Sequence, residues 1–146
     1  MKKILVVNGP NLNLLGQRED NIYGKDTLKQ IELACMKKCK KMKLDLDFYQ
    51  SNNEGEIIDK MHEIHNEYDG LIINPAAFTH SSIAILDCLR SITKPKIEIH
   101  ISNIYSREDY RKKSITSEGV NGLICGFGAD SYILGIEAIS KLIYNK

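Results

Sequence analysis

Short apolar runs rich in β-branched residues alternate along the chain with longer segments in which apolar residues recur every three or four positions. A short, continuous apolar run bounded by polar residues predicts a buried strand, whereas the longer period predicts an amphipathic helix. On this basis the sequence predicts five strands, at residues 3–8, 44–50, 70–74, 96–102 and 120–126.

Four helical segments are predicted around these strands. In the first, apolar residues from Leu28 to Met42 repeat at i, i+3 and i+4. Thr27, with Gln30 three residues further on, resembles a capping box at its start, and Asn53 with Glu56 gives a weaker start signal for the second. The other helical segments cover residues 57–68, 80–92 and 129–144.

Strands joined by helix-length connections predict a parallel sheet with both faces covered. The order is βαβαβαβ, an irregular stretch and then βα, which favours an α/β, flavodoxin-like three-layer sandwich with a five-stranded parallel sheet. The length of 146 residues fits one catalytic domain, residues 1–146. In such folds ligands bind beyond the carboxyl ends of the strands, so the chemistry is expected in those loops.

The charge balance limits the kinds of partner. Twenty basic and nineteen acidic residues leave a formal charge of +1, so no global field attracts nucleic acid or an anionic membrane, and any anion site must be local. The apolar runs are far shorter than the ~20 residues of a membrane span. The N-terminus, MKKILVVNGP, begins like a signal peptide, but its apolar part is only four residues long. We expect a first strand there and a cytoplasmic protein.

Cysteine and histidine spacing gives little support for a metal site. Four cysteines in a chain of this size are expected to be reduced and mostly buried rather than disulfide-bonded. Cys35 and Cys39 lie one helical turn apart, but they lack the second pair that a zinc site needs. His62 and His65 stand in HEIH rather than HExxH, and His65 is predicted to lie on the apolar face of its helix. We therefore expect no metal.

The segment after the first strand carries the first candidate group. Residues 8–24 read NGPNLNLLGQREDNIYG and show no helix signal, and a loop of that length in a small domain is usually functional or disordered. It contains Asn11, Arg18 and Tyr23. A guanidinium near a tyrosine favours phenolate over phenol, which would make Tyr23 a base. The alternative is that Tyr23 only packs its ring in a turn.

The fourth predicted strand carries the second candidate group. Glu98 and His100 are two residues apart, so their side chains leave the same face of the strand. The carboxylate can orient the imidazole and hold it protonated, which makes His100 a plausible proton donor. The alternative is a hydrogen-bonded core histidine. Asn74, at the end of the third strand, is a candidate ligand group, or it merely ends the strand before Pro75.

Four blocks together resemble the type II 3-dehydroquinate dehydratases: NGPNLNLLGQRE with the following YG, NPAAFTHSS, EIHISNIYSRE with Arg111, and GLICGFGADSY. The resemblance covers nearly the whole chain. It implies a flavodoxin-like fold and reversible loss of water from 3-dehydroquinate, a small anion, to give 3-dehydroshikimate. This is a step of the shikimate pathway, and it also serves quinate breakdown.

The resemblance also implies roles for single residues. Tyr23 matches the base, Arg18 the residue that activates it, His100 the acid that protonates the departing hydroxyl, and Asn11 the residue that holds a water near the enolate oxygen. Further positions match the substrate-binding set: Asn74 with the backbone of Ile101 and Ser102 at the carboxylate, and His80, Arg111 and Asp87 at the ring hydroxyls, Asp87 coming from a neighbouring subunit.

Family members form dodecamers built from trimers and use no metal or cofactor, so a homo-oligomer is expected. Ala76 stands where glycine is common in the family, which predicts that the backbone there does not need a positive φ.

Two other classes of function stay open at this point. A flavodoxin-like binding or signalling module would share the fold, but the first loop has neither a GxGxxG nor a GxxxxGKS phosphate motif. Receiver domains use acidic residues after the first and third strands, where this chain has Asn8 and Asn74. An inert assembly subunit is disfavoured because Arg18, Tyr23 and His100 are all present.

Overall fold

The sheet at the centre of the molecule has five parallel strands. The computed structural model describes residues 1–17 and 19–145. The strands run in the order β2-β1-β3-β4-β5, which is the flavodoxin-like order and confirms the predicted fold class. Their bounds are Lys2–Asn8 (β1), Leu44–Gln50 (β2), Gly70–Asn74 (β3), Lys96–His100 (β4) and Gly122–Cys125 (β5).

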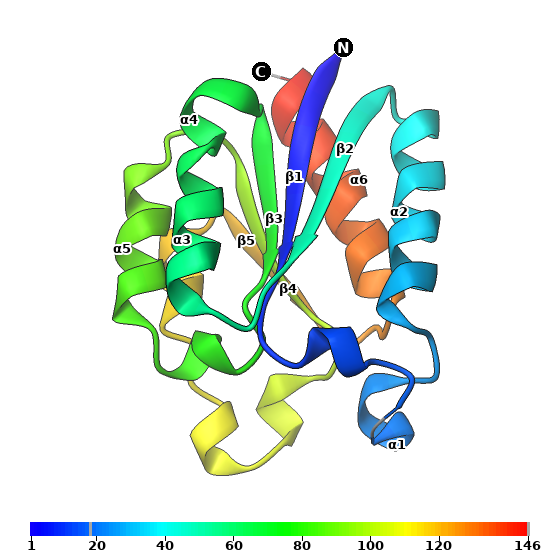
Figure 1. Ribbon diagram of the computed structural model, residues 1–146, viewed down its shortest axis with the longest axis vertical. Helices are drawn as coiled ribbons and strands as arrows, with labels where there is room; N and C mark the ends of the chain where they lie inside the picture. The colour runs from blue at the N-terminus through cyan, green and yellow to red at the C-terminus, as the bar shows by residue number, and fades with distance from the viewer. Residues whose placement is uncertain (18, 146) are drawn as a thin grey trace.

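Helices cover both faces of this sheet (Figure 1). One face is covered by α2 (Leu28–Lys41) and α6 (Asp130–Tyr144), and the other by α3 (Glu54–His62), α4 (Ile64–Glu67) and α5 (Ile83–Ser91). Both chain termini lie at the end of the sheet where the strands begin. The short helix α1 (Asp20–Tyr23) and the loops that follow β1, β3 and β4 lie at the opposite edge, where the strands end (Figure 1).

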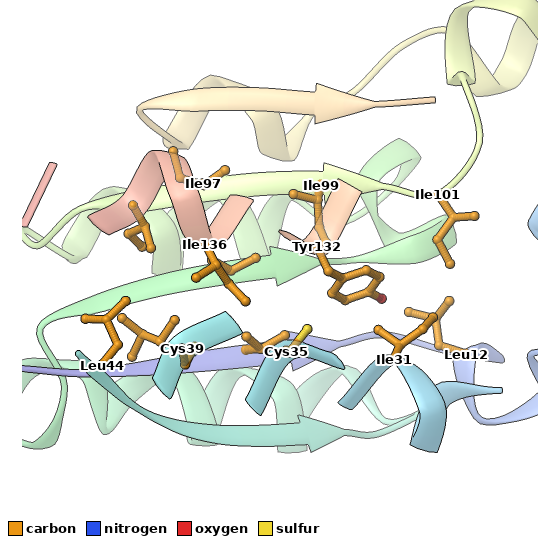
Figure 2. Packing of buried hydrophobic residues seen from close by; sticks show 14 of the residues in the cluster. Leu12, Ile31, Cys35, Cys39, Leu44, Ile97, Ile99, Ile101, Tyr132 and Ile136 are labelled. Carbon is orange, nitrogen blue, oxygen red and sulfur yellow. The ribbon is translucent and has the colours of Figure 1, made fainter. Parts of the chain in front are cut away.

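The alternation of side chains along β1 explains the two apolar layers. Ile4 and Val6 point toward α2 and α6, whereas Leu5 and Val7 point toward α3 and α5. Figure 2 shows the first layer, in which Tyr132 of α6 lies among Ile31, Cys35 and Ile99 with its oxygen directed toward the ends of the strands. A polar atom is thus brought from the apolar layer to the edge where ligands bind.

The second predicted helix differs from the structure. It is interrupted at Glu63 and forms two helices, α3 and α4. Ile57, Met61 and Ile64 are buried as expected, but His65 is exposed. The prediction that His65 lies on the apolar face was wrong, because the interrupted helix turns Ile64 into the core and its neighbour outward.

Two other strands and one other helix are shorter in the structure than predicted. β4 ends at His100 rather than 102, and β5 covers four residues, because parallel pairing between these strands extends only from Ile97 with Gly122 to His100 with Cys125. The predicted helix 80–92 begins later, at Ile83, where the Ser82 Oγ accepts the Ile85 N–H at 2.9 Å. Residues 76–80 form a separate 3₁₀ helix, η2 (Ala76–His80).

The turn after β3 contradicts a second expectation, since Ala76 has a φ of +51°. Its N–H donates to the Asn74 Oδ1 at 3.1 Å, and the Gly9 N–H donates to the Asn74 carbonyl at 2.8 Å. A Cβ at Gly9 would lie 2.5 Å from the Pro75 carbonyl oxygen, so the two turns are in direct contact. These contacts hold the turn closed and force a positive φ on an alanine.

Every helix found among residues 1–17 and 19–145 is too short or too polar to span a lipid bilayer.

Replacing Ala76 by glycine is expected to stabilise the protein. A left-handed conformation costs an L-residue about 1–2 kcal/mol, and glycine removes this cost. Glycine also makes the unfolded chain more flexible, which cancels part of the benefit, so the free energy of unfolding should rise by about 0.5–1 kcal/mol. Ala77→Gly is the matched control, because Ala77 has no positive φ and should lose stability. Urea unfolding at one protein concentration measures both; an equal loss in the two variants would contradict the strain at Ala76.

Candidate active site

A cleft of about 630 Å³, part of it open to solvent, lies at the carboxyl ends of β1, β3 and β4. This is where a sheet with this strand order binds its ligands. Most of the predicted site residues line the cleft: Asn11, Tyr23, Asn74, His80, His100, Ile101, Ser102 and Arg111. Groups from the three segments that follow β1, β3 and β4 are therefore brought together around one space.

Two of the other predicted residues do not line the cleft, and a third is not described. Glu98 is fully buried behind His100 and does not line the cleft. Asp87 is exposed on α5 and does not line the cleft of its own chain. Arg18 lies outside the described residues.

His100 and Glu98 form a buried pair, as their spacing predicted. The His100 Nε2 lies 2.7 Å from the Glu98 Oε2, and the two residues are 5% and 0% exposed. Burial pushes the pKa of Glu98 upward, but hydrogen bonds from His100, Thr116 and Thr79 and the charge of His100 outweigh it, so the pKa lies below its ordinary value. Glu98 is thus an anion that holds one imidazole nitrogen and leaves Nδ1 for a ligand.

Tyr23 is paired with a guanidinium that the sequence interpretation had not selected. The Arg107 Nη1 donates to the Tyr23 hydroxyl at 2.9 Å, and the Arg107 Cζ lies 5.2 Å from the ring centroid. Arg107 also contacts the Ser102 Oγ at 3.4 Å. No spacing rule in the sequence connects Arg107 with Tyr23, which is 84 positions away.

Asn74 is held by a buried network that joins β1, β3 and α6. The Tyr132 hydroxyl donates to the Asn8 Oδ1 at 2.6 Å and accepts from the Asn74 Nδ2 at 3.0 Å. The Asn74 Oδ1 accepts the Ala76 N–H. Because both ends of the Asn74 amide are fixed, its second N–H has one direction, and Asn74 lines the cleft.

His80 presents an acceptor to the cleft. Its Nδ1 lies 2.7 Å from the Lys113 carbonyl, which only accepts, so Nδ1 carries the proton. Burial, followed by the charges of His100, Arg111 and Arg107, lowers the pKa of His80 and outweighs that hydrogen bond. His80 is therefore neutral near pH 7, with Nε2 free to accept a hydrogen bond.

The cleft combines two fixed cations, Arg107 and Arg111, with donors from amide and hydroxyl groups. This makes a local anion site in a chain of almost no net charge. Tyr23 and His100 are groups that can exchange protons with a bound ligand, so the arrangement is suited to acid–base chemistry on a small anion.

Neither metal binding nor thiol chemistry has support in the described part of the chain. Its His, Cys, Asp and Glu side chains form no group of three that could hold a metal ion. Its four cysteines are free, as predicted. Burial raises the pKa of Cys35 to about 12 and that of Cys39 to about 11, which makes these thiols unreactive.

The comparisons with known proteins agree on one family. The family model described as "Dehydroquinase class II" matches residues 2–140. A 3-dehydroquinate dehydratase of Clostridium botulinum is 55% identical over 139 residues, which cover 95% of each chain, and one of Rhizobium meliloti is 51% identical over 95% of this chain and 94% of its own. The crystal structure of a type II dehydroquinase from Butyrivibrio crossotus superposes with a TM-score of 0.92 at 47% identity, covering 94% of this chain and 97% of that one.

Tyr132→Phe is expected to lower the free energy of unfolding by about 1–3 kcal/mol, because it leaves buried groups of Asn8 and Asn74 without a partner. Tyr144→Phe is the matched control: its hydroxyl donates to the Lys43 carbonyl at 2.6 Å, but the residue is 46% exposed, so water can replace the bond. Denaturant unfolding of both variants measures the difference. Similar losses would show that the Tyr132 network adds nothing beyond one hydrogen bond.

Proposed function

The chain belongs to the class II dehydroquinase family and is a 3-dehydroquinate dehydratase, a hydro-lyase, and we propose that Tyr23 is its base and His100 its acid. The observation that carries this assignment is that both side chains line the same cleft. Since the family is that of an enzyme, the alternatives of a binding or signalling module and of an inert subunit are not needed.

The first step is removal of a proton from the carbon beside the substrate's ketone. A phenolate is required, and the Arg107 guanidinium, which donates a hydrogen bond to the Tyr23 hydroxyl, is the cation that we propose for this task. We propose the same task for Arg18, which stands five positions before Tyr23 in the chain. Two cations close to one phenol would favour phenolate more strongly than one.

Loss of that proton puts negative charge on the ketone oxygen. Donors fixed in advance around this oxygen supply much of the acceleration in reactions of this kind. We propose that Asn11 holds a water there. The backbone at Asn11 is suited to a fixed position, because its φ is +68° and its N–H donates to the Asn52 Oδ1 at 2.9 Å.

The second step is loss of the hydroxyl, which leaves as water if it receives a proton. In the proposal His100 is the donor, and Glu98 keeps the imidazole charged until the transfer takes place. Each proton transfer then has a side chain to perform it, and the reaction as proposed uses no metal or cofactor.

The remaining residues are proposed to bind the substrate. The Asn74 amide and the backbone of Ile101 and Ser102 would hold its carboxylate, while His80 and Arg111 would engage its ring hydroxyls. We propose that Asp87 acts in the cleft of a neighbouring subunit within a dodecamer of trimers. Its exposure on α5, outside the cleft of its own chain, supports this assignment.

The reaction yields 3-dehydroshikimate and belongs to the shikimate pathway that leads to aromatic amino acids. We propose that residues 1–146 form one catalytic domain and that the enzyme works in the cytoplasm. The free thiols at Cys35, Cys39, Cys88 and Cys125 support a reducing compartment.

Tyr23→Phe should reduce turnover by about 10²–10⁴-fold, the usual contribution of a general base, because the ring stays and only the proton acceptor is lost. The assay follows the ultraviolet absorbance of the conjugated enone formed from 3-dehydroquinate. Tyr105→Phe, which changes a tyrosine that is 51% exposed and outside the cleft, is the control. Near wild-type turnover in Tyr23→Phe would remove Tyr23 as the base.

Borohydride treatment during turnover should leave the protein unmodified. The unrelated type I enzymes react through a Schiff base, which needs a lysine at the substrate's ketone. Among the described residues no lysine lines this cleft, so no imine is expected to be trapped. Mass spectrometry of the treated enzyme gives the answer, and a covalent adduct on a lysine would contradict the proposed mechanism.

A further inference from the structure

Three hydroxyl groups surround the carboxylate of Glu98, on the side away from the cleft. The Glu98 Oε2 accepts from the Thr79 Oγ1 at 2.8 Å and from the Ser114 Oγ at 3.0 Å, in addition to its contact with His100. The Glu98 Oε1 accepts from the Thr116 Oγ1 at 2.5 Å. Thr79, Thr116 and Glu98 are all 0% exposed, so water does not replace these bonds.

Counting protons shows that the hydroxyls are not equivalent. The Thr79 Oγ1 also lies 2.6 Å from both the Ser114 Oγ and the Thr116 Oγ1, so three hydroxyl protons serve five short contacts. The Glu98 Oε2 can accept a hydrogen bond from Thr79 or from Ser114, as well as from His100. Within residues 1–17 and 19–145, Oε1 has a single donor, which is Thr116. If Thr116 gave its proton to Thr79 instead, a buried anionic oxygen would lose its partner.

The backbone places Thr116 independently of its hydroxyl. It begins the 3₁₀ helix η5 (Thr116–Gly119), and the preceding Ile115 N–H donates to the Thr79 carbonyl at 2.7 Å. At the other end of η5, a Cβ on Gly119 would lie 2.9 Å from the Cβ of Leu89, so η5 packs closely against α5. Removing the hydroxyl should therefore leave η5 in place.

We propose that Thr116 is a positioning residue for the acid of this enzyme: its hydroxyl holds the second oxygen of Glu98, keeps that carboxylate ionised and so keeps the proton on His100. This inference rests on the proposed role of His100. Without the Thr116 bond, a fully buried carboxylate would be less stable as an anion, and the shared proton would move from His100 to Glu98. The pair would then be neutral and poor as a proton donor.

Other groups around the pair do not replace this bond. Among the described residues, the charged and titratable side chains that line the cleft with His100 are His80 from η2, Arg107 and Arg111 from the loop after β4, and Tyr23 from α1. All of them lie on the cleft side, whereas Oε1 is held by Thr116 behind His100. The protonation of Glu98 should therefore follow the Thr116 hydroxyl.

The first test measures the protonation state of the Glu98 carboxyl group directly and needs no enzymatic turnover. Infrared spectra of protein labelled with ¹³C-glutamate separate a neutral carboxylic acid from a carboxylate, and Glu98→Gln identifies the band. Thr116→Val should raise the pKa of Glu98 by about one unit or more, because the lost bond was made to a charge. Thr116→Ser should keep the wild-type titration. Thr79→Val, the matched control, should shift the titration less, since Ser114 can still serve Oε2.

The second test measures steady-state kinetics over a range of pH. In Thr116→Val, kcat should fall about ten-fold or more, while KM stays close to wild type because Thr116 does not line the cleft. Thr116→Ser should restore kcat, and Thr79→Val should lose less than about three-fold. If Thr116→Val does not fold, Thr116→Cys replaces it, because a thiol is a weak donor and should give an intermediate kcat and titration.

Three results would overturn the proposal. One is an unshifted Glu98 titration in Thr116→Val, whatever happens to kcat. Another is an equal loss in Thr116→Ser and Thr116→Val, which would assign the effect to packing at this position rather than to the hydroxyl. The third is an equal effect of Thr79→Val. Full turnover in His100→Asn would instead refute the proposed acid, and the Glu98 titration would still test whether Thr116 controls the carboxylate.

Discussion

The buried negative charge of Glu98 is the constraint that organises the site. An ionised carboxylate without partners costs several kcal/mol in a protein interior, so a chain that keeps one at zero exposure must bring donors to both oxygens. His100 lies two positions further along the same strand, while the hydroxyl donors come from η2 and from residues 114–116. Satisfying one charge therefore fixes how the loops after β3 and β4 meet, and these loops carry His80, Arg107 and Arg111 into the cleft.

The sequence predicts the features that depend on how apolar and polar residues repeat within a short segment. Five strands, their parallel arrangement and the Glu98–His100 pair follow from side-chain alternation and connection length, and all of them are present. Contacts between distant segments leave no such signal. Arg107 reaches Tyr23 across 84 positions, and Tyr132 reaches Asn8 across 124. The positive φ at Ala76 is of the same kind, because a close turn at Gly9 imposes it and alanine itself favours a negative φ.

Near neutrality of the whole chain and a positive cleft are compatible because the cations are concentrated at one edge. Arg107 and Arg111 line the cleft, while many acidic side chains are paired elsewhere, such as Asp47 with Lys3 and Glu137 with Lys38. His80 adds no charge near pH 7, since burial lowers its pKa. The neutral imidazole then offers an acceptor rather than a third cation beside Arg107 and Arg111. The cleft thus combines two cations with a small number of oriented neutral groups.

The proposed acid and base are held in different ways, and the difference follows from what each must do. His100 belongs to a strand of the sheet and its carboxylate partner is inaccessible to water, so its side chain is held in place before substrate arrives. Tyr23 belongs to a four-residue helix within the loop after β1 and is only half-buried. In the proposed mechanism a phenolate takes a proton from carbon, a step that competing water would hinder, so water must be kept from Tyr23 at that moment. The proposed acid is therefore built into the sheet and the proposed base is carried on a loop, so a change in that loop would leave the buried Glu98–His100 pair in place.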